Sequence, residues 1–492
     1  MSEVQYLRPT SLAEVQACLQ QHPQGQLLAG GQSLLAAMRL GLTQPSHLVD
    51  LQDVVELQDI RVSHDHVWIG AMVTHARIAA EGQLQRQYPM LAELAHGIAD
   101  QQVRNVGTLG GSLANNDPAA CWPAGVLAYG ATLVTNQRDI PADHFFTDLF
   151  TTALQAGEVL LGVRLPACAS AQYVKYEQPA SRFAMVGVAI TRTTANTHSP
   201  VRVAITGLGH GVMRWPEAEA ALQAHWSVQS LDGLRLAPDL AQSDVHASAS
   251  YRAHLGAVLC RRAVAAQTGE VAHLPRPAAP STPRAPQTPA SLAHTNRANH
   301  TTQHAHNPAA ISGSHHLAQS VSQVWDALLD PAVLQPCIPG CESIQRLDDT
   351  HYSAVVKVGL GPVSARFVTQ IHLQPVRPPS QGEPTECRLQ LSGQAGSLGQ
   401  GSAEVVVHLH TEMSDAGTAG TRLMWHATPQ LSGQLAQLGN RLVQASARSL
   451  STQFFVRLTQ VMGGASTAPL PPSIFYAWRT HLSRWLQRFF KR

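Results

Sequence analysis

The chain has 492 residues, of which 44% are hydrophobic and 13% are charged, and its formal net charge is +2. This length predicts two to four domains of roughly 150 residues each, and the balanced charge argues against a nucleic-acid-binding protein, which carries a concentrated basic surface. No apolar stretch reaches the roughly 18 residues that a membrane span needs, and the first residues lack the basic and apolar regions of a secretory signal, so we expect a cytoplasmic protein that binds no nucleic acid.

The first half mixes helices and strands. The pattern predicts a helix over 10–20, opened by a Ser/Thr cap, and a short strand over 26–29 that runs into two glycines. Further elements are expected in this half: strands over 66–70, 131–135 and 201–208, and helices over 75–81, over 88–98 and from Pro216. Strands and helices do not alternate regularly, which indicates an α+β fold rather than a doubly wound sheet.

Two similar glycine motifs stand in this half. Residues 27–33 read LLAGGQS, and residues 106–112 read VGTLGGS. Each is interpreted as an apolar strand, a Gly-Gly pair, a small polar residue and then a helix. Paired glycines let a ligand approach the backbone, and a helix N-terminus offers unpaired N–H groups that suit a pyrophosphate. Neither motif is a P-loop or a GxGxxG fingerprint, and simple turns explain either motif alone equally well.

AGGQS at 29–33 and TLGGS at 108–112, followed by NNDPAA, resemble the FAD-binding (medium) subunit of the molybdenum hydroxylases, the xanthine and carbon monoxide dehydrogenase family. The runs GEVLLGVRLP (157–166) and PASRFAMVGVAI (179–190) belong to the same resemblance, which covers about residues 1–272. It implies an FAD-binding domain of two α/β subdomains over 1–175 and an α+β C-terminal subdomain over 176–272.

The resemblance also implies which residues bind FAD. The two glycine motifs would hold the diphosphate and ribityl chain, and a residue of the late strand would pack near the flavin. Carried over to this sequence, the expected FAD-binding residues are Ala29, Gly30, Gly31, Gln32, Ser33, Thr108, Gly110, Gly111, Ser112, Asn115 and Leu160.

The sequence departs from the family pattern in two places. Cys121 stands where relatives often carry an acid, and Glu177 and Gln178 stand where they often carry a base. Nearby charge tunes the affinity and the potential of a flavin, so we expect these changes to affect FAD rather than the fold.

A proline-rich and histidine-rich segment separates the two halves. Prolines recur at 275, 277, 280, 283, 286 and 289, and such a segment cannot bury enough apolar surface to offset its ordering entropy. We therefore predict a linker over 273–310.

The second half begins with a helix predicted over 321–330 and ends with a long helix over about 434–462. Strands are expected between them, over 351–360, 364–374, 387–393, 402–410 and 421–429. Antiparallel strands wrapped on one long helix form a cup. The run VWDALLDPAVLQPCIPGCESI (324–344) resembles the G-subunit family of carbon monoxide dehydrogenase, a START-like helix-grip fold, over about 311–462. The resemblance implies a separate domain that connects the dehydrogenase to the membrane, with either an apolar ligand cavity or a filled interior and a docking role.

The tail, residues 463–492, is predicted to form an amphipathic basic helix after a Gly/Pro-rich break. On a helix, one face collects Ile474, Trp478, Leu482, Trp485, Leu486 and Phe489, and the other collects Arg484, Arg488 and Lys491. This pattern is typical of a helix that lies in a membrane surface; docking on its own protein or a partner is the alternative.

The seven cysteines are scattered and include no CxxC pair. Cys337 and Cys341 are four residues apart without a second ligand pair, so we expect buried free thiols. Many histidines lie in the linker, where they define no geometry. The sequence therefore predicts neither a metal site nor an iron–sulfur cluster of its own.

The resemblance implies an FAD-dependent electron-transfer subunit, and the sequence shows no catalytic triad or carboxylate pair that would argue against it. The resemblance implies that a large molybdopterin subunit and a small [2Fe–2S] subunit deliver electrons to FAD, which passes them to an outside acceptor. Because the second domain and the tail are expected to connect the chain to the inner face of the cell membrane, we expect this acceptor to be a quinone. Two alternatives remain: a stand-alone flavin oxidase, and an assembly or recruitment factor for the dehydrogenase whose FAD is vestigial.

Overall fold

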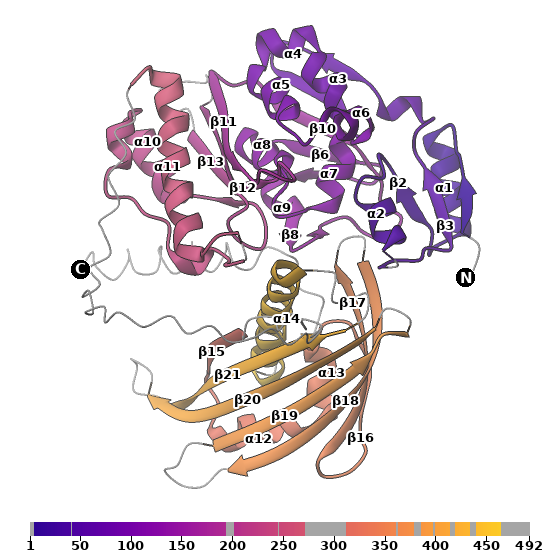
Figure 1. The fold of residues 1–492 in the computed structure, drawn as a ribbon, viewed down its shortest axis with the longest axis vertical. Helices are drawn as coiled ribbons and strands as arrows, with labels where there is room; N and C mark the ends of the chain where they lie inside the picture. The colour runs from indigo at the N-terminus through magenta and orange to yellow at the C-terminus, as the bar shows by residue number, and fades with distance from the viewer. Residues whose placement is uncertain are drawn as a thin grey trace, which may run out of the picture.

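The computed structural model has a flavoprotein-like half and a second half built on one large sheet (Figure 1). It describes residues 4–40, 42–192, 201–244, 246–270, 311–360, 363–377, 385–396, 399–413, 419–432 and 439–463. The predicted linker and tail lie outside the described residues.

A small parallel sheet opens the chain. Its strand order is β1-β3-β2, and its elements are β1 (Gln5–Leu7), α1 (Leu12–Gln21), β2 (Gln26–Leu28), α2 (Leu34–Arg39) and β3 (His47–Asp50). The Ser11 hydroxyl caps α1 by accepting from the N–H of Glu14, as the Ser/Thr-capped helix predicted from sequence requires. Val15 of α1 packs with Val49 of β3 in the core of this unit.

A five-stranded antiparallel sheet forms the second unit, in the order β4-β5-β10-β6-β7. Its strands are β4 (Ile60–Val62), β5 (His66–Gly70), β6 (Thr132–Thr135), β7 (Asp139–Pro141) and β10 (Leu160–Pro166), with a small hairpin of β8 (Phe146–Asp148) and β9 (Thr151–Thr152). Its helices are α3 (His75–Ala80), α4 (Gly82–Gln87), α5 (Pro89–His96), α6 (Gln101–Val106), α7 (Leu109–Asn115), α8 (Trp122–Tyr129) and α9 (Ala142–Phe145). All eight residues of α8 are buried, so this helix is the centre of the flavoprotein core.

A four-stranded antiparallel sheet and two helices complete the first half. They are β11 (Ser170–Glu177), β12 (Ala184–Arg192), β13 (Val201–Thr206), β14 (Met213–Arg214), α10 (Pro216–Ala224) and α11 (Ala249–Thr268). The ends of β12 and β13 hold the DPAA segment (117–120): the Thr206 hydroxyl donates to the carbonyls of Pro118 and Ala120, and the N–H of Ala184 donates to Ala119. The third unit therefore supports one wall of the second.

The second half is a seven-stranded antiparallel sheet curved around one helix (Figure 1). Its elements are β15 (Ile311–Leu317), α12 (Val321–Leu329), α13 (Pro331–Cys337), β16 (Cys341–Arg346), β17 (His351–Leu360), β18 (Val363–Arg377), β19 (Thr385–Gln394), β20 (Gln400–Met413), β21 (Ala419–Leu431) and α14 (Gly439–Met462). Leu409 and Leu423 of the sheet pack against Leu458 of α14. A hydrogen bond joins the halves, from Gln453 Nε2 of α14 to Asp148 Oδ2 at 2.8 Å.

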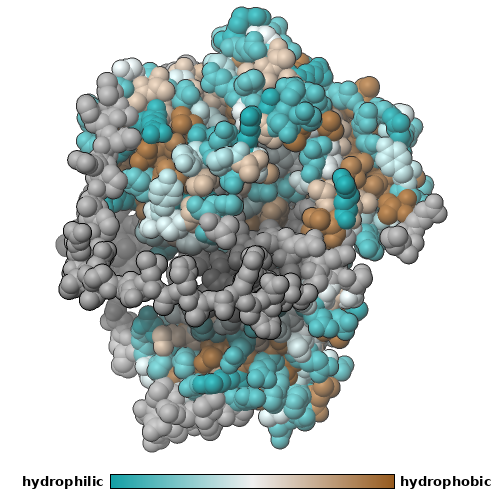
Figure 2. Space-filling view, in the orientation of Figure 1, coloured by the Kyte–Doolittle hydropathy of each residue, from teal (hydrophilic) through white to brown (hydrophobic). Residues whose placement is uncertain are grey.

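The described surface is mixed rather than strongly apolar. On the face shown in Figure 2, hydrophilic residues predominate over both halves, with hydrophobic residues scattered among them. The exposed large hydrophobic side chains include Tyr6, Val55 and Leu347, which belong to three different sheets or their connections. Apolar side chains exposed singly are ordinary for a folded protein, so these residues do not mark a binding surface.

This architecture confirms the predicted fold class: an α+β first half followed by a separate domain in which a curved sheet surrounds one long helix. The second glycine motif was interpreted incorrectly. Within the described residues 42–192, no strand leads into Gly110; α6 ends at Val106, and the glycine pair lies in the first turn of α7. The seven cysteines are free, but Cys18, Cys168 and Cys341 are partly exposed rather than buried.

Candidate cofactor site

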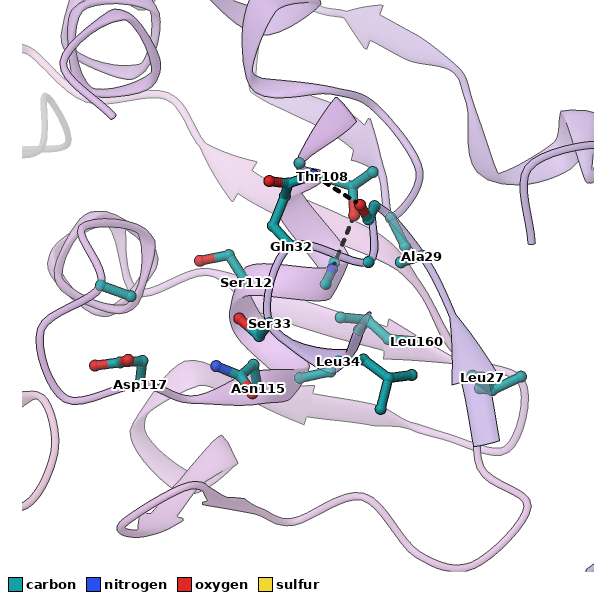
Figure 3. A pocket seen from close by; sticks show the side chains of 18 of the residues that line it. Leu27, Ala29, Gln32, Ser33, Leu34, Thr108, Ser112, Asn115, Asp117 and Leu160 are labelled. Carbon is teal, nitrogen blue, oxygen red and sulfur yellow. Dashed lines mark hydrogen bonds between the residues drawn. The ribbon is translucent and has the colours of Figure 1, made fainter. Parts of the chain in front are cut away.

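All eleven predicted site residues line one pocket, with a volume of about 620 Å³. The pocket lies between the parallel sheet and the five-stranded sheet, and a loop of the third unit closes one side through Ser181, Arg182 and Phe183. Figure 3 shows the two glycine segments side by side, and a Cβ on Gly111 would lie 3.3 Å from Ala29 Cβ. Two motifs that lie far apart in the sequence therefore form one site.

The first segment presents a run of free backbone donors. Gly31 has a φ of +67°, a left-handed conformation that glycine adopts without strain. In the described part of the chain, the N–H groups of Gly31, Gln32, Ser33 and Leu34 donate to no protein acceptor, and the Ser33 hydroxyl makes no capping bond. Successive N–H groups around a left-handed residue form a concavity that binds anions.

In the second segment, three consecutive backbone N–H groups donate to acceptors within the protein. The Leu109 N–H donates to the Val73 carbonyl at 3.0 Å, and the Gly110 N–H donates to the Ala71 carbonyl at 2.8 Å. The Gly111 N–H donates to the Thr108 hydroxyl at 3.1 Å. The expectation that these three N–H groups at the helix N-terminus are unpaired is therefore wrong. The segment contributes side chains to the lining of the pocket instead.

Close packing within the protein, and not only a ligand, requires glycine at two of these positions. A Cβ on Gly30 would lie 2.3 Å from the Val106 carbonyl oxygen, and a Cβ on Gly110 would lie 2.5 Å from Ala71 Cβ. Both distances are far below van der Waals contact. Gly30 and Gly110 thus allow segments of the protein to pack together, and this packing sets the shape of the pocket.

Polar side chains of both units are gathered in the pocket. Figure 3 shows Ser33, Ser112, Asn115 and Asp117 with their polar ends turned to the same side. Leu160 lies on the opposite wall, where the pairing of β10 with β6 is interrupted by a bulge between Leu160 and Gly162. A polar side and an apolar wall suit a ligand with a charged chain and an aromatic ring.

Of the departures from the family pattern, Cys121 lines the pocket, whereas Glu177 and Gln178 do not. Burial raises the pKa of the Cys121 thiol, so it remains neutral and unreactive at physiological pH. Lys175 Nζ donates to the carbonyls of Gly97 and Arg182 and lies 3.5 Å from a Glu177 oxygen. Positive charge is therefore present beside the pocket although positions 177 and 178 carry none.

Several lining residues were not predicted. Among them are His75, Ile98, Ala99, Phe150, Glu158, Arg182 and Phe183. The run that contains Arg182 and Phe183 was noted as a motif but not as part of the site. His75 carried no sequence signal, because a lone histidine at a helix start is common.

Fold and pocket together define a two-lobed cofactor-binding protein, with an anion-binding loop in one lobe and an apolar wall in the other. Comparisons with known proteins identify the class more closely. Residues 2–168 match the family described as FAD binding domain in molybdopterin dehydrogenase, and residues 171–267 match the CO dehydrogenase flavoprotein C-terminal domain. Residues 313–463 match CoxG, the G-subunit family of carbon monoxide dehydrogenase.

Individual relatives of known class support the same family assignment. The nicotine 6-hydroxylase medium subunit of Paenarthrobacter nicotinovorans is 33% identical over 280 residues, which cover 53% of this chain and 96% of the relative. The carbon monoxide dehydrogenase medium chain of Hydrogenophaga pseudoflava is 34% identical, covering 53% and 95%. A solved structure of carbon monoxide dehydrogenase from Hydrogenophaga pseudoflava matches with a TM-score of 0.50 and 33% identity, covering 54% of this chain and 98% of that one.

The chain belongs to the medium, FAD-binding subunits of the molybdenum hydroxylases, and it carries a CoxG domain after the flavoprotein. It is an oxidoreductase subunit, and its cofactor is FAD. The free N–H groups at 31–34 and the volume of the pocket fit a dinucleotide. None of the described helices is long and apolar enough to cross a membrane.

Proposed function

We propose that the eleven pocket residues hold FAD between the two lobes. The observation that carries this proposal is the run of free N–H groups at Gly31–Leu34, which is suited to the doubly charged diphosphate. The hydroxyl of Ser112 and the amide of Asn115 complete the polar side, and Leu160 offers an apolar surface to the ring.

When bound, FAD supplies the electron-carrying chemistry. The residues of this chain bind it, orient it and restrict its contact with water. Electrons arrive from a large molybdopterin subunit and a small iron–sulfur subunit, in keeping with relatives that are named as medium subunits, and leave to an outside acceptor.

Replacing Ser112 tests the pocket. Ser112→Phe fills the polar side with a ring and should abolish FAD binding, whereas Ser112→Ala removes one hydroxyl and should reduce the affinity by less than about tenfold. The flavin content of the purified full chain and titration of the apoprotein with FAD measure both effects. Stoichiometric FAD in Ser112→Phe would contradict the proposed site.

We further propose that the CoxG domain and the tail connect the complex to the cytoplasmic face of the membrane, where a quinone accepts the electrons. The support is the sequence pattern of residues 473–492, since anionic headgroups attract basic residues by about 1 kcal/mol per charge near the surface. Truncation after Pro472 should leave FAD content unchanged and abolish flotation with anionic vesicles.

Trp478→Glu combined with Trp485→Glu should reproduce the truncation, and salt should weaken the binding of the full chain. Equal flotation of all three proteins, or of none at low salt, would contradict a membrane role for the tail.

A further inference from the structure

His75, the first residue of α3, is buried beside the proposed FAD site. It is 5% exposed and lines the pocket. Its backbone N–H donates to the Gly107 carbonyl at 2.9 Å, which fixes it against the turn between α6 and α7. The imidazole ring is fixed separately, by Trp122 of the central helix α8: Trp122 Nε1 donates to His75 Nδ1 at 3.1 Å.

This contact determines where the imidazole carries its proton. An indole N–H donates but cannot accept, so Nδ1 must be the unprotonated, accepting nitrogen. A neutral histidine in this state carries its hydrogen on Nε2. Trp122 is fully buried, so it cannot turn to water and release Nδ1 without disrupting the core.

The surroundings also keep the ring neutral. Burial, with a smaller contribution from the Arg104 guanidinium, lowers the pKa of His75 to about 4. A charged imidazolium would in addition turn an Nδ1–H toward the Trp122 N–H. Across the physiological range the ring is therefore an uncharged donor of fixed direction.

The Nε2–H has no protein acceptor among the described residues. A Cβ on the adjacent Gly107 would lie 3.1 Å from Nε2, so the absence of a side chain at Gly107 leaves this edge of the ring uncovered. Unlike the buried polar atoms of the described residues that lack a partner, Nε2 reaches the solvent of the pocket, so an acceptor atom of a ligand would replace water at this donor.

We propose that His75, held by Trp122, donates its Nε2–H to an acceptor atom of bound FAD and thereby positions the cofactor. The inference rests on the proposed FAD site. Because the donor is neutral, it contributes a hydrogen bond to recognition without placing a positive charge beside the flavin.

The test uses the full chain with ¹⁵N-labelled histidine, as apoprotein and with FAD. The expected spectrum shows His75 with an unprotonated Nδ1 and a protonated Nε2 in both states, assigned by the loss of its signals in His75→Phe. On addition of FAD, the Nε2–H proton should shift downfield and exchange more slowly. An unprotonated Nε2, or a proton signal that FAD leaves unchanged, would overturn the proposal.

Affinity provides the second readout. His75→Phe keeps a ring but removes the donor, and should weaken FAD binding about tenfold. His75→Gln keeps both an acceptor for Trp122 and a donor for FAD, and should restore most of the affinity. Thermal melting of each apoprotein verifies that it is folded.

The control variant is Ser112→Phe, which blocks the pocket without touching His75. Unchanged FAD affinity in a folded His75→Phe, together with loss of FAD in Ser112→Phe, would refute the role of His75 and leave the site intact. Retention of FAD by Ser112→Phe would instead refute the site.

Discussion

Gly110→Ala distinguishes two reasons for a glycine in the second motif. If Gly110 only admits a ligand, an alanine should weaken FAD binding and leave the apoprotein as stable as before, or more stable, because alanine favours a helix by about 1 kcal/mol over glycine. If Gly110 is required for packing, the apoprotein itself should lose stability.

The structure favours packing. The added Cβ would lie 2.5 Å from Ala71 Cβ and 2.7 Å from the Ala71 carbonyl oxygen, so α7 must move by roughly 1 Å to reach ordinary contact. That movement stretches the 2.8 Å hydrogen bond from the Gly110 N–H to the same carbonyl. Overpacking of this kind costs about 1–3 kcal/mol, and the weakened hydrogen bond costs about 1 kcal/mol more. The gain in helix propensity offsets about 1 kcal/mol, which leaves a net loss of about 1–3 kcal/mol.

The assay is differential scanning calorimetry of the apoprotein, followed by FAD titration. The flavoprotein transition should move down by roughly 2–12 °C, and FAD affinity should fall because Ser112 and Asn115 move with α7. Gly111→Ala is the neighbouring control: its Cβ would meet the Thr108 hydroxyl at 2.9 Å and Ala29 Cβ at 3.3 Å, with no backbone atom as close, so a smaller shift is expected. An unchanged or raised melting temperature in Gly110→Ala would refute the packing argument.

Two further predictions concern buried charges of the flavoprotein half. Burial alone would raise the pKa of Glu158, but its ion pair with Arg138 at 3.0 Å and its other hydrogen bonds lower it; this carboxylate therefore stabilises the fold above about pH 4.3, and the stabilisation is lost as the pH falls through the lowered pKa. Glu158→Gln should cost about 1–2 kcal/mol at pH 7, a value reduced because Arg138 is 43% exposed. Urea unfolding at pH 7 and pH 3 should show a smaller difference from wild type in acid. Arg252→Met breaks a pair with Asp244 whose side chains are 2% and 3% exposed, and urea unfolding should show a loss of about 3–5 kcal/mol, of which Arg252→Lys should recover part.

The first glycine motif could be predicted from sequence because its conformation depends on residues that are adjacent in the chain. The strand β2 and the helix α2 are adjacent in the chain, and the glycines between them must turn the backbone, as the positive φ of Gly31 requires. The strand over 66–70 was predicted to the residue for the same reason, since HVWIG alternates within a few positions.

The second motif was misread because the apolar residues before it resemble a strand. Two capping residues decide the outcome instead: Asp100 accepts from the Val103 N–H at the start of α6, and Thr108 accepts from the Gly111 N–H at the start of α7. Each is an N-cap residue whose partner is three positions on, so a signal for two short helices was present in the sequence and was outweighed by the apolar run.

The role of His75 could not be predicted, because its meaning depends on Trp122, which is 47 positions away. A single sequence contains no record of such a contact. The same holds for the hydrogen bonds from Leu109 and Gly110 to the carbonyls of Val73 and Ala71, in the connection between β5 and α3, which occupy the donors that the second motif was expected to offer.

The two glycine motifs therefore look alike in sequence and differ in their physical task. In the first, the N–H groups at 31–34 remain free and suit an anion. In the second, the N–H groups of Leu109, Gly110 and Gly111 are bound within the protein, and the close approach of α7 to Ala71 places Ser112 and Asn115 in the same pocket as that anion site. A ligand held by both must bridge two lobes with separate cores, so FAD binding should couple their stabilities by mass action. Excess FAD should accordingly raise the melting temperature of both lobes together, and this coupling should vanish in Ser112→Phe.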